Sequence, residues 1–256
     1  MPVPSHASIV TALRAAGCVF AEDEADLILA AATTPEQLRA LVARRAAGEP
    51  LEQVVGWAEF CGLRITVDPG VFVPRRRTEF LVERAREVTP PDALVVDLCC
   101  GSGALGAALA ATARPAALHA ADLDPAAVAC ARRNLAGVGT VHRGDLFDPL
   151  PAELRGRVHT LLANVPYVPT REIALLPAEA RDHEARLALD GGADGLAVLR
   201  RVATGAGHWL RPGGHLLFET SERQLPHAVA VVRDAGLTPQ VAVDEDRDAT
   251  VVLAAR

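Results

Sequence analysis

The sequence predicts an α/β fold with a mostly parallel sheet, preceded by a small helical region. Two observations carry this prediction. After residue 92, apolar runs that suit strands alternate with segments of helical periodicity, which is typical of a parallel sheet covered by helices on both faces. A glycine-rich loop follows the first of these runs and opens the next helix, as in nucleotide-binding α/β folds.

The chain before residue 92 divides into a helical part and an extended part. Apolar residues recur at helical spacing as far as Gly48, and Thr34 followed by Pro35 marks a helix start inside this part. The runs Gln53–Glu59 and Leu63–Val67, separated by a glycine-containing turn, predict a β-hairpin. We therefore expect three parts: a helical domain (1–50), a β-hairpin linker (51–78) and an α/β domain (79–256).

The alternating part has seven candidate strands and four long helices. The strands fit at Ala93–Leu98, Ala117–Asp122, Thr140–Arg143, Val158–Ala163, His215–Glu219, Gln240–Val243 and Thr250–Ala254. The helices fit at Ala104–Ala113, Pro125–Leu135, Leu196–Trp209 and Gln224–Ala235, with a shorter one at Thr78–Glu87. Only a short polar stretch joins the last two strands, which favours a terminal antiparallel hairpin.

Composition narrows the class of protein. Hydrophobic residues make up 50% of the 256 residues and charged residues 23%, which is typical of a globular protein. The net charge of −6 argues against a large nucleic-acid footprint. We expect no metal site, signal peptide or membrane span. Five cysteines without C-x-x-C spacing favour a reducing, cytoplasmic setting: Cys18, Cys61, Cys99, Cys100 and Cys130.

The glycine loop Gly101-Ser102-Gly103 closes the first strand of the sheet and indicates a cofactor site. With Gly106 it satisfies G-x-G-x-x-G, a pattern that lets a ligand approach the backbone at a helix N-terminus. Asp122 ends the next strand, where a carboxylate can accept hydrogen bonds from a ribose diol, and Leu123 follows it. Either a nicotinamide cofactor or S-adenosylmethionine fits this much.

Two further acids favour S-adenosylmethionine. Asp97 stands just before the glycines, where it would repel a pyrophosphate but attract the ammonium of a methionine moiety. Asp145 follows the third strand and can accept from an adenine amino group, with Leu146 against the ring. Acids at three successive strand ends also suit helix caps, but their coincidence beside the glycine loop favours an adenosyl ligand.

The motif Asn164-Val165-Pro166-Tyr167 ends the strand Val158–Ala163, at the edge where open α/β sheets bind ligands. An asparagine side chain offers one acceptor and two donors, which suits another planar amide or an aminated base. Proline fixes the backbone, and tyrosine supplies an aromatic wall with a polar tip. This motif predicts a site that holds a flat, nitrogen-containing acceptor.

Together these motifs resemble the class I S-adenosylmethionine-dependent methyltransferases and, more narrowly, the protein-(glutamine-N5) methyltransferases that modify peptide chain release factors or a ribosomal protein. The likeness runs from about Gly48 to Gln224. Further matching blocks are Pro50, Gly56, Phe60 with Gly62, Pro69–Arg75, Thr78–Glu79, Glu184, Ala188–Leu196, Leu210–Gly214, Glu219 and Gln224. The resemblance implies a Rossmann-like, seven-stranded sheet, with S-adenosylhomocysteine as the product left from the cofactor.

The resemblance also implies roles at the acceptor site. The Asn164 side chain and the carbonyl of Val165 would accept the two hydrogens of a glutamine amide, and Tyr167 would pack on its plane. The expected partner is a protein with an exposed glutamine, release factor-like or ribosomal, with no membrane involved and nucleic acid not the expected substrate.

Departures from the family pattern concern the acceptor side most. Val165 replaces a proline, and Arg76 and Arg77 stand where the family carries proline and an acid. Cys99-Cys100 and Thr220-Ser221 are also unusual. These departures indicate a paralogous branch with Asn-(Val/Ala/Thr)-Pro-Tyr. Three alternatives stay open: a DNA or RNA amino-methyltransferase, an NAD-dependent oxidoreductase, and a non-catalytic S-adenosylmethionine-binding protein.

Charged residues near these motifs have two interpretations each. Arg75 and Glu184 are candidates for substrate binding, as are Asp190 and Asp194, which suit loop stabilisation equally. For the run Arg75–Arg77, one arginine paired with a domain carboxylate is favoured over contact with acidic protein or ribosomal RNA. His183 and Glu184 are expected to form a surface pair.

Overall fold

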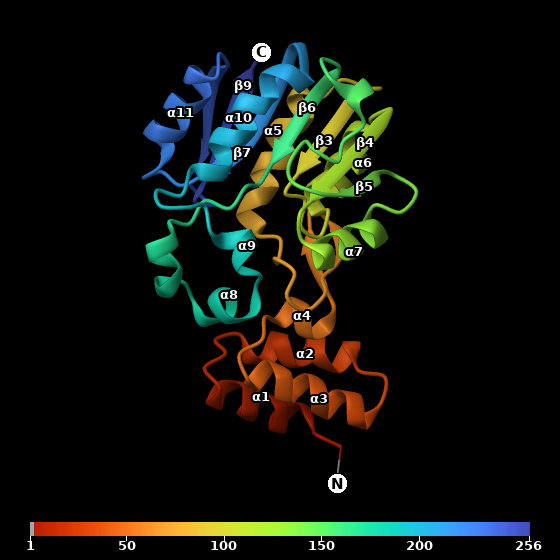
Figure 1. Ribbon diagram of the computed structural model, residues 1–256. Helices are drawn as coiled ribbons and strands as arrows, with labels where there is room; N and C mark the ends of the chain where they lie inside the picture. The colour runs from red at the N-terminus through yellow and green to blue at the C-terminus, as the bar shows by residue number, and fades with distance from the viewer. Residues whose placement is uncertain (1–2) are drawn as a thin grey trace.

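A seven-stranded sheet forms the centre of the computed structural model, which describes residues 3–256 (Figure 1). Met1 and Pro2, where the predicted helical domain begins, lie outside the described residues. The strands are β3 (Leu94–Leu98), β4 (Ala117–Asp122), β5 (Thr140–Arg143), β6 (Val158–Ala163), β7 (Leu210–Thr220), β8 (Thr238–Asp244) and β9 (Ala249–Ala255). Their order is β5-β4-β3-β6-β7-β9-β8; the first five are parallel, and β9 is antiparallel to both of its neighbours. The predicted mostly parallel sheet with a terminal antiparallel hairpin is confirmed.

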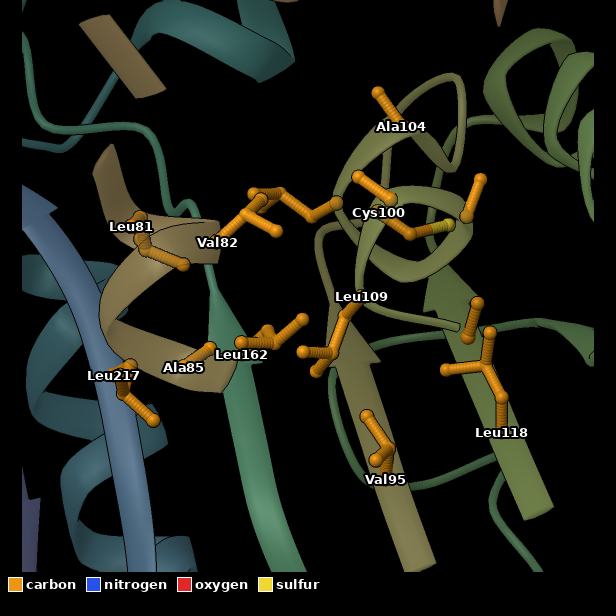
Figure 2. Packing of buried hydrophobic residues seen from close by; sticks show 14 of the residues in the cluster. Leu81, Val82, Ala85, Val95, Cys100, Ala104, Leu109, Leu118, Leu162 and Leu217 are labelled. Carbon is orange, nitrogen blue, oxygen red and sulfur yellow. The ribbon is translucent and has the colours of Figure 1, made fainter. Parts of the chain in front are cut away.

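Helices cover both faces of this sheet, because alternate residues of each strand point to opposite sides. The helices are α5 (Glu79–Val88), α6 (Ala104–Ala113), α7 (Pro125–Asn134), α10 (Ala197–Trp209) and α11 (Leu225–Asp234). Val95 packs in the cluster of α5, α6 and α7, whereas Val96 packs in the cluster of α10 and α11. Figure 2 shows Leu81 of α5 and Leu109 of α6 on the same face as Leu162 of β6. The inner strands β3, β6 and β9 are therefore buried on both sides, whereas the edge strand β8 is largely exposed.

The N-terminal part is a helical bundle with a core of its own. Its helices are α1 (His6–Ala15), α2 (Ala21–Ala31), α3 (Pro35–Ala46) and α4 (Leu51–Val55). Ile9, Leu13 and Ile28 are fully buried in this core. The side chain of Thr34 caps α3 by accepting from the backbone N–H of Gln37 at 3.1 Å, so the predicted helix start is confirmed. The domain limits at residues 50 and 78 stay a prediction.

The hairpin that follows is shorter than the sequence predicts. Strand β1 (Trp57–Phe60) pairs with β2 (Leu63–Thr66), but the first half of the predicted run Gln53–Glu59 is helical and belongs to α4. The reason is local: Gly56 adopts a left-handed conformation (φ 87°) and ends that helix, so the strand begins only after it. The extended prediction was therefore wrong for residues 53–55.

A segment between β6 and α10 was not predicted as structured. It contains a 3-10 turn (Thr170–Leu175) and the short helices α8 (Ala178–His183) and α9 (Arg186–Leu189). Figure 1 shows α8 and α9 between the sheet and the helical bundle. A hydrogen bond of 3.2 Å from Gln53 to the carbonyl of His183 ties the segment to α4. The segment thus covers the C-terminal edge of the sheet.

No helix within residues 3–256 is long and apolar enough to cross a bilayer; the longest, α10, has 13 residues.

Candidate active site

A cavity of about 530 Å³ lies at the C-terminal edge of the sheet, within the size range of small-molecule sites. One half is walled by the loops after β3, β4 and β5, and the other by the loop after β6, the hairpin linker and α8. Most of the predicted site residues line it: Arg75, Gly101, Ser102, Asp122, Leu123, Asp145, Leu146, Asn164, Val165, Pro166, Tyr167 and Glu184. Asp97 and Gly103 do not; they lie beneath the wall of the cavity.

The loop after β3 adopts a conformation that only certain residues tolerate. Gly101 and Gly103 have φ values of 54° and 79°, in the region that favours glycine, and Cys99 is held at 54° although it carries a side chain. A Cβ on Gly103 would lie 3.1 Å from Leu135, so this position also needs a glycine for helix packing. The strained loop keeps backbone N–H groups at the start of α6 beside the cavity.

Asp97 is a buried acid below this loop. Its Oδ2 accepts from the backbone N–H of Gly106 at 3.0 Å, while its buried Oδ1 has no hydrogen-bond partner in the part of the chain that the structure describes. Burial, opposed by that hydrogen bond, raises the pKa of Asp97 to about 7. An unpartnered carboxylate oxygen is costly unless a cation or a donor approaches it. Asp97 therefore offers a free carboxyl oxygen that a cation or a donor would satisfy.

The acids after β4 and β5 are fixed differently. Asp122 accepts from the backbone N–H of Gly101 at 2.8 Å and of Asp124 at 2.9 Å, which orients its carboxylate on the cavity wall, and burial raises its pKa. Asp145 accepts from Arg201 at 2.7 Å and is partly exposed. Leu146, in a left-handed conformation (φ 47°), turns into the wall beside it. This half of the cavity has apolar sides between two fixed acids.

Asn164 is the most informative residue of the other half. It follows the last residue of β6 and lines the cavity, and its buried Oδ1 atom has no hydrogen-bond partner within the described residues. A buried amide oxygen that no protein group satisfies costs free energy, so such an atom usually serves a ligand. The orphaned acceptor lies where the sequence predicted that an amide would be gripped.

The backbone after Asn164 is clamped by a loop from further along the chain. Gln224 donates to the carbonyl of Tyr167 at 2.9 Å, and Gly195 packs so closely that a Cβ there would lie 2.3 Å from that carbonyl. A Cβ on Gly191 would likewise lie 2.7 Å from the carbonyl oxygen of Pro166. Val165 is buried, with 2% of its surface exposed. The motif is thus held rigidly even though valine lacks the fixed φ of proline.

Tyr167 is held at its tip by a three-residue network that the sequence did not predict. Arg77 donates to its hydroxyl from Nη2 at 2.6 Å, and the hydroxyl donates to Glu219 at 3.2 Å. Arg77 Nε also donates to Glu219, at 2.9 Å. Burial, together with the charge of Glu219, raises the pKa of Tyr167 to about 12, so the phenol stays neutral. The sequence signal for this network was Glu219, an acid that follows the apolar run Leu216–Phe218 within β7.

Two of the three arginines in the run pair with domain carboxylates, where one was expected. Besides the pair of Arg77 with Glu219, Arg75 donates from Nη2 to both oxygens of Glu184 at 2.6 and 2.7 Å. The expected surface pair of His183 with Glu184 was wrong, because the Glu184 side chain is fully buried under Arg75. Arg75 and Glu184 join the linker to the segment before α9.

Asp190 and Asp194 mainly stabilise their own loop. Asp190 accepts from Thr170 at 2.6 Å and from the backbone of Gly192, and it also lines the cavity. Asp194 accepts from the backbone of Leu196 at 3.1 Å, just before α10. Both residues thus make the contacts expected for loop stabilisation, and Asp190 also lies where a substrate could reach it.

The sequence of this chain is similar to those of known methyltransferases. The family model described as "Methyltransferase small domain" matches residues 62–192. Release factor glutamine methyltransferases of Geobacter sulfurreducens and Mycolicibacterium smegmatis are 42% and 43% identical over 191 and 211 residues, covering 72% and 80% of this chain and 66% and 74% of those proteins. A 4-amino-L-phenylalanine/4-methylamino-L-phenylalanine methyltransferase of Streptomyces pristinaespiralis is 37% identical over 234 residues, 88% of this chain and 78% of that protein.

Solved structures agree on the fold. A methyltransferase from Pyrococcus furiosus aligns with a TM-score of 0.58 at 15% identity, covering 76% of this chain and 88% of that one. A ribosomal protein L11 methylase from Lactobacillus delbrueckii subsp. bulgaricus aligns with a TM-score of 0.54 at 16% identity, covering 75% and 84%. The chain therefore has the class I methyltransferase fold, is a methyltransferase, and belongs to the release factor glutamine methyltransferase family.

Proposed function

We propose that this enzyme transfers a methyl group from S-adenosylmethionine to the side-chain amide nitrogen (N5) of a glutamine in a protein, release factor-like or ribosomal. The observation that carries the proposal is that Asn164 lines the cavity while its buried Oδ1 has no hydrogen-bond partner among residues 3–256. The named activity of the relatives that match most of this chain supports the same reaction.

The cofactor half of the cavity fits S-adenosylmethionine. The unpartnered Oδ1 of Asp97 suits a neighbouring cationic ammonium, and the oriented carboxylate of Asp122 suits a ribose diol. Leu123 and Leu146 offer apolar contacts for an adenine, and the free capacity of Asp145 suits its amino group. Gly101, Ser102 and Gly103 supply the tight turn that brings backbone N–H groups to the ligand. Asp97 and Gly103 act from beneath the wall in this proposal.

The acceptor half fits a planar nitrogen group. Asn164 Oδ1 accepts one amide hydrogen and the carbonyl of Val165 the other, while the ring of Tyr167 packs on the amide plane. A glutamine nitrogen is a weak nucleophile because its lone pair is delocalised, so catalysis depends on orientation in a water-poor site. The clamp of Gln224 and Gly195 on the Tyr167 carbonyl provides this orientation.

The proposed methyl transfer forms one bond, breaks one bond and releases one proton. When bound, S-adenosylmethionine supplies a sulfonium methyl group; an N–CH₃ bond forms, the S–CH₃ bond breaks, and S-adenosylhomocysteine remains. The nitrogen loses one proton to solvent. Asn164 and Val165 polarise the amide by accepting its hydrogens, so they lower the cost of the positive charge that develops on nitrogen.

A second candidate acceptor is an aromatic amine of a free amino acid. The observation that favours it is the Streptomyces pristinaespiralis relative, named for 4-amino-L-phenylalanine, which matches 88% of this chain. An aromatic amine is also flat and conjugated, so Asn164 and Tyr167 would hold it in the same way. The two candidates share the cofactor and differ in the size of the acceptor.

A labelling experiment separates them. The purified enzyme is given S-adenosylmethionine with a labelled methyl group, and either a lysate from cells lacking this enzyme or 4-amino-L-phenylalanine. We expect label on a glutamine side chain of a single protein, located by mass spectrometry. Label on the free amino acid alone would establish the second candidate, and label in nucleic acid would overturn both.

We also propose a cytoplasmic location. All five cysteines are free thiols, two of them buried, and a reducing compartment keeps thiols in this state.

A further inference from the structure

The guanidinium of Arg77 lies beside the acceptor site with part of its hydrogen-bonding capacity unused. Its side chain is 42% exposed and lines the cavity. Nε donates to Glu219 and Nη2 to the Tyr167 hydroxyl, but Nη1 makes no hydrogen bond to any residue of the described chain, 3–256. An arginine offers five N–H donors, so the Nη1 pair remains free for a ligand.

Arg45 of the same molecule shows how one guanidinium binds two carboxylates at once. Its Nε donates to Glu24 at 2.6 Å, and its Nη1 donates to a second carboxylate, Glu179, also at 2.6 Å. One guanidinium thus binds two carboxylates from different sides in this same molecule. Arg77 has the first carboxylate, Glu219, in the matching place, and its Nη1 position is open.

The position of Arg77 defines what would occupy that place. Its Nη2 donates to the hydroxyl at the tip of Tyr167, whose ring is the proposed platform for the reacting group, and its side chain lines the same cavity, so an acceptor held on that ring lies within reach of Arg77. Glu219 does not move to meet a ligand, because Thr78 holds its second oxygen at 2.7 Å and 4% of its side chain is exposed. The unused Nη1 donors of Arg77 therefore belong to a guanidinium whose position is already fixed by Glu219 and Tyr167.

We propose that Arg77 selects methyl acceptors that carry a carboxylate one side-chain length from the reacting nitrogen. This inference rests on the proposed acceptor site. The carboxylate can be the α-carboxylate of a free or C-terminal residue, or the side chain of an acidic neighbour in a peptide. Both sources present the planar oxygen pair that a guanidinium binds in two-point fashion.

Two matched pairs of acceptors test the proposal, each differing in one charge. The first pair is N-acetylglutamine and its carboxyl-capped methylamide; the second is a blocked peptide with Gly-Asp-Gln and its Gly-Asn-Gln counterpart. Dissociation constants are measured by calorimetry with S-adenosylhomocysteine present, for the parent, Arg77→Gln, Arg77→Lys and Arg76→Gln. Arg76 is the matched control, because it is exposed and makes no ion pair within the described residues.

We expect the parent to bind the charged member of one pair about 10-fold more tightly, a partly exposed charge-assisted contact. Arg77→Gln should reduce this preference to near unity; because the substitution also frees Tyr167 and Glu219 from their shared partner, both members should bind more weakly, and the ratio of their dissociation constants is the readout. Arg77→Lys should keep part of it, and Arg76→Gln all of it. The pair that shows the preference identifies the source of the carboxylate.

Equal affinity for both members of both pairs in the parent would overturn the proposal, and so would a preference that survives Arg77→Gln. A separate turnover assay with labelled methyl groups tests the proposed function. Binding that discriminates without methylation would refute the reaction but not the role of Arg77, whereas methylation without discrimination would refute the role alone.

Discussion

The two halves of the cavity are built on different principles. In the cofactor half, two of the three acids, Asp97 and Asp122, are fixed by backbone N–H groups, as where Gly101 holds Asp122. In the acceptor half, side chains from distant parts of the chain hold one another, as Arg77 and Glu219 hold Tyr167. The first half therefore depends on local sequence, and the second on how three segments meet. Substitutions should therefore distinguish the contribution of the cofactor half from that of the acceptor half.

The largest effect is expected in the cofactor half, at Asp97. Ionising this buried carboxyl opposes folding as the pH rises from about 4, its pKa in the unfolded chain, to about 7, its pKa in the fold. Asp97→Asn removes that cost. We expect the variant to be more stable than the parent at pH 8, by up to about 4 kcal/mol, and the difference to vanish as the pH approaches 4.

Urea unfolding at several pH values measures this difference. Calorimetry should also show S-adenosylmethionine binding about 10-fold more weakly to the variant, because the ammonium loses its counter-charge. A variant less stable than the parent at pH 8, or one with unchanged cofactor affinity, would contradict the assigned role of Asp97.

The next effect belongs to the acceptor half. Asn164→Ala should lower kcat/KM at least about 100-fold, or roughly 3 kcal/mol, because the hydrogen-bond acceptor for the amide is lost. Its stability should not fall, since the Oδ1 atom has no protein partner to lose. Turnover and thermal unfolding measured on the same sample check this. A variant that is destabilised by over 1 kcal/mol yet still turns over would identify Asn164 as structural.

A smaller effect tests the clamp on Tyr167. Gly195 and Gly213 both have positive φ, at 78° and 74°, but only a Cβ at Gly195 would meet other atoms. Gly213→Ala should lose about 1 kcal/mol from backbone strain, and Gly195→Ala should lose more, because its Cβ would also lie 2.3 Å from the Tyr167 carbonyl oxygen. Only Gly195→Ala should also lower kcat, by about 10-fold, because it displaces the Tyr167 carbonyl. Equal activity of the two variants would show that the clamp does not orient the acceptor.

The smallest effect is expected at Val165. Val165→Pro restores the residue typical of the family at a site whose carbonyl, not its side chain, is proposed to act. We expect kcat/KM to change by less than about threefold, because Gln224 and Gly195 already fix the backbone that follows. Steady-state kinetics measure it. A loss above 10-fold would show that valine shapes the acceptor site of this branch.

Sequence patterns predicted the cofactor half better than the acceptor half, and the reason is physical. Strands β4, β5 and β6 and helix α6 match their predicted limits, because a buried parallel sheet leaves continuous apolar runs and its loops carry glycines and acids. The same runs place Asp122 and Asn164 at one edge. Helix α4 overlaps a predicted strand, because a helix of five residues leaves no periodicity to detect.

The acceptor half depends on contacts between residues far apart in the chain. Arg77 and Glu219 are 142 residues apart, and Arg75 and Glu184 are 109 apart, so no local pattern links them. The burial of Glu184, which made the expected pair with His183 wrong, follows from where the linker meets α9. Helix α8 is short and mostly polar, and α9 has only four residues, so contacts with the helical bundle and the linker, not periodicity, define this segment.

The central claim is that Asn164 and Val165 hold a planar amide beside the cofactor. A crystal structure of the enzyme with S-adenosylhomocysteine and a glutamine peptide tests it most directly. The account predicts the glutamine nitrogen within hydrogen-bond distance, about 3 Å, of both Asn164 Oδ1 and the Val165 carbonyl, with the Tyr167 ring on the amide plane. A glutamine bound elsewhere, with Asn164 Oδ1 satisfied by the cofactor instead, would contradict it.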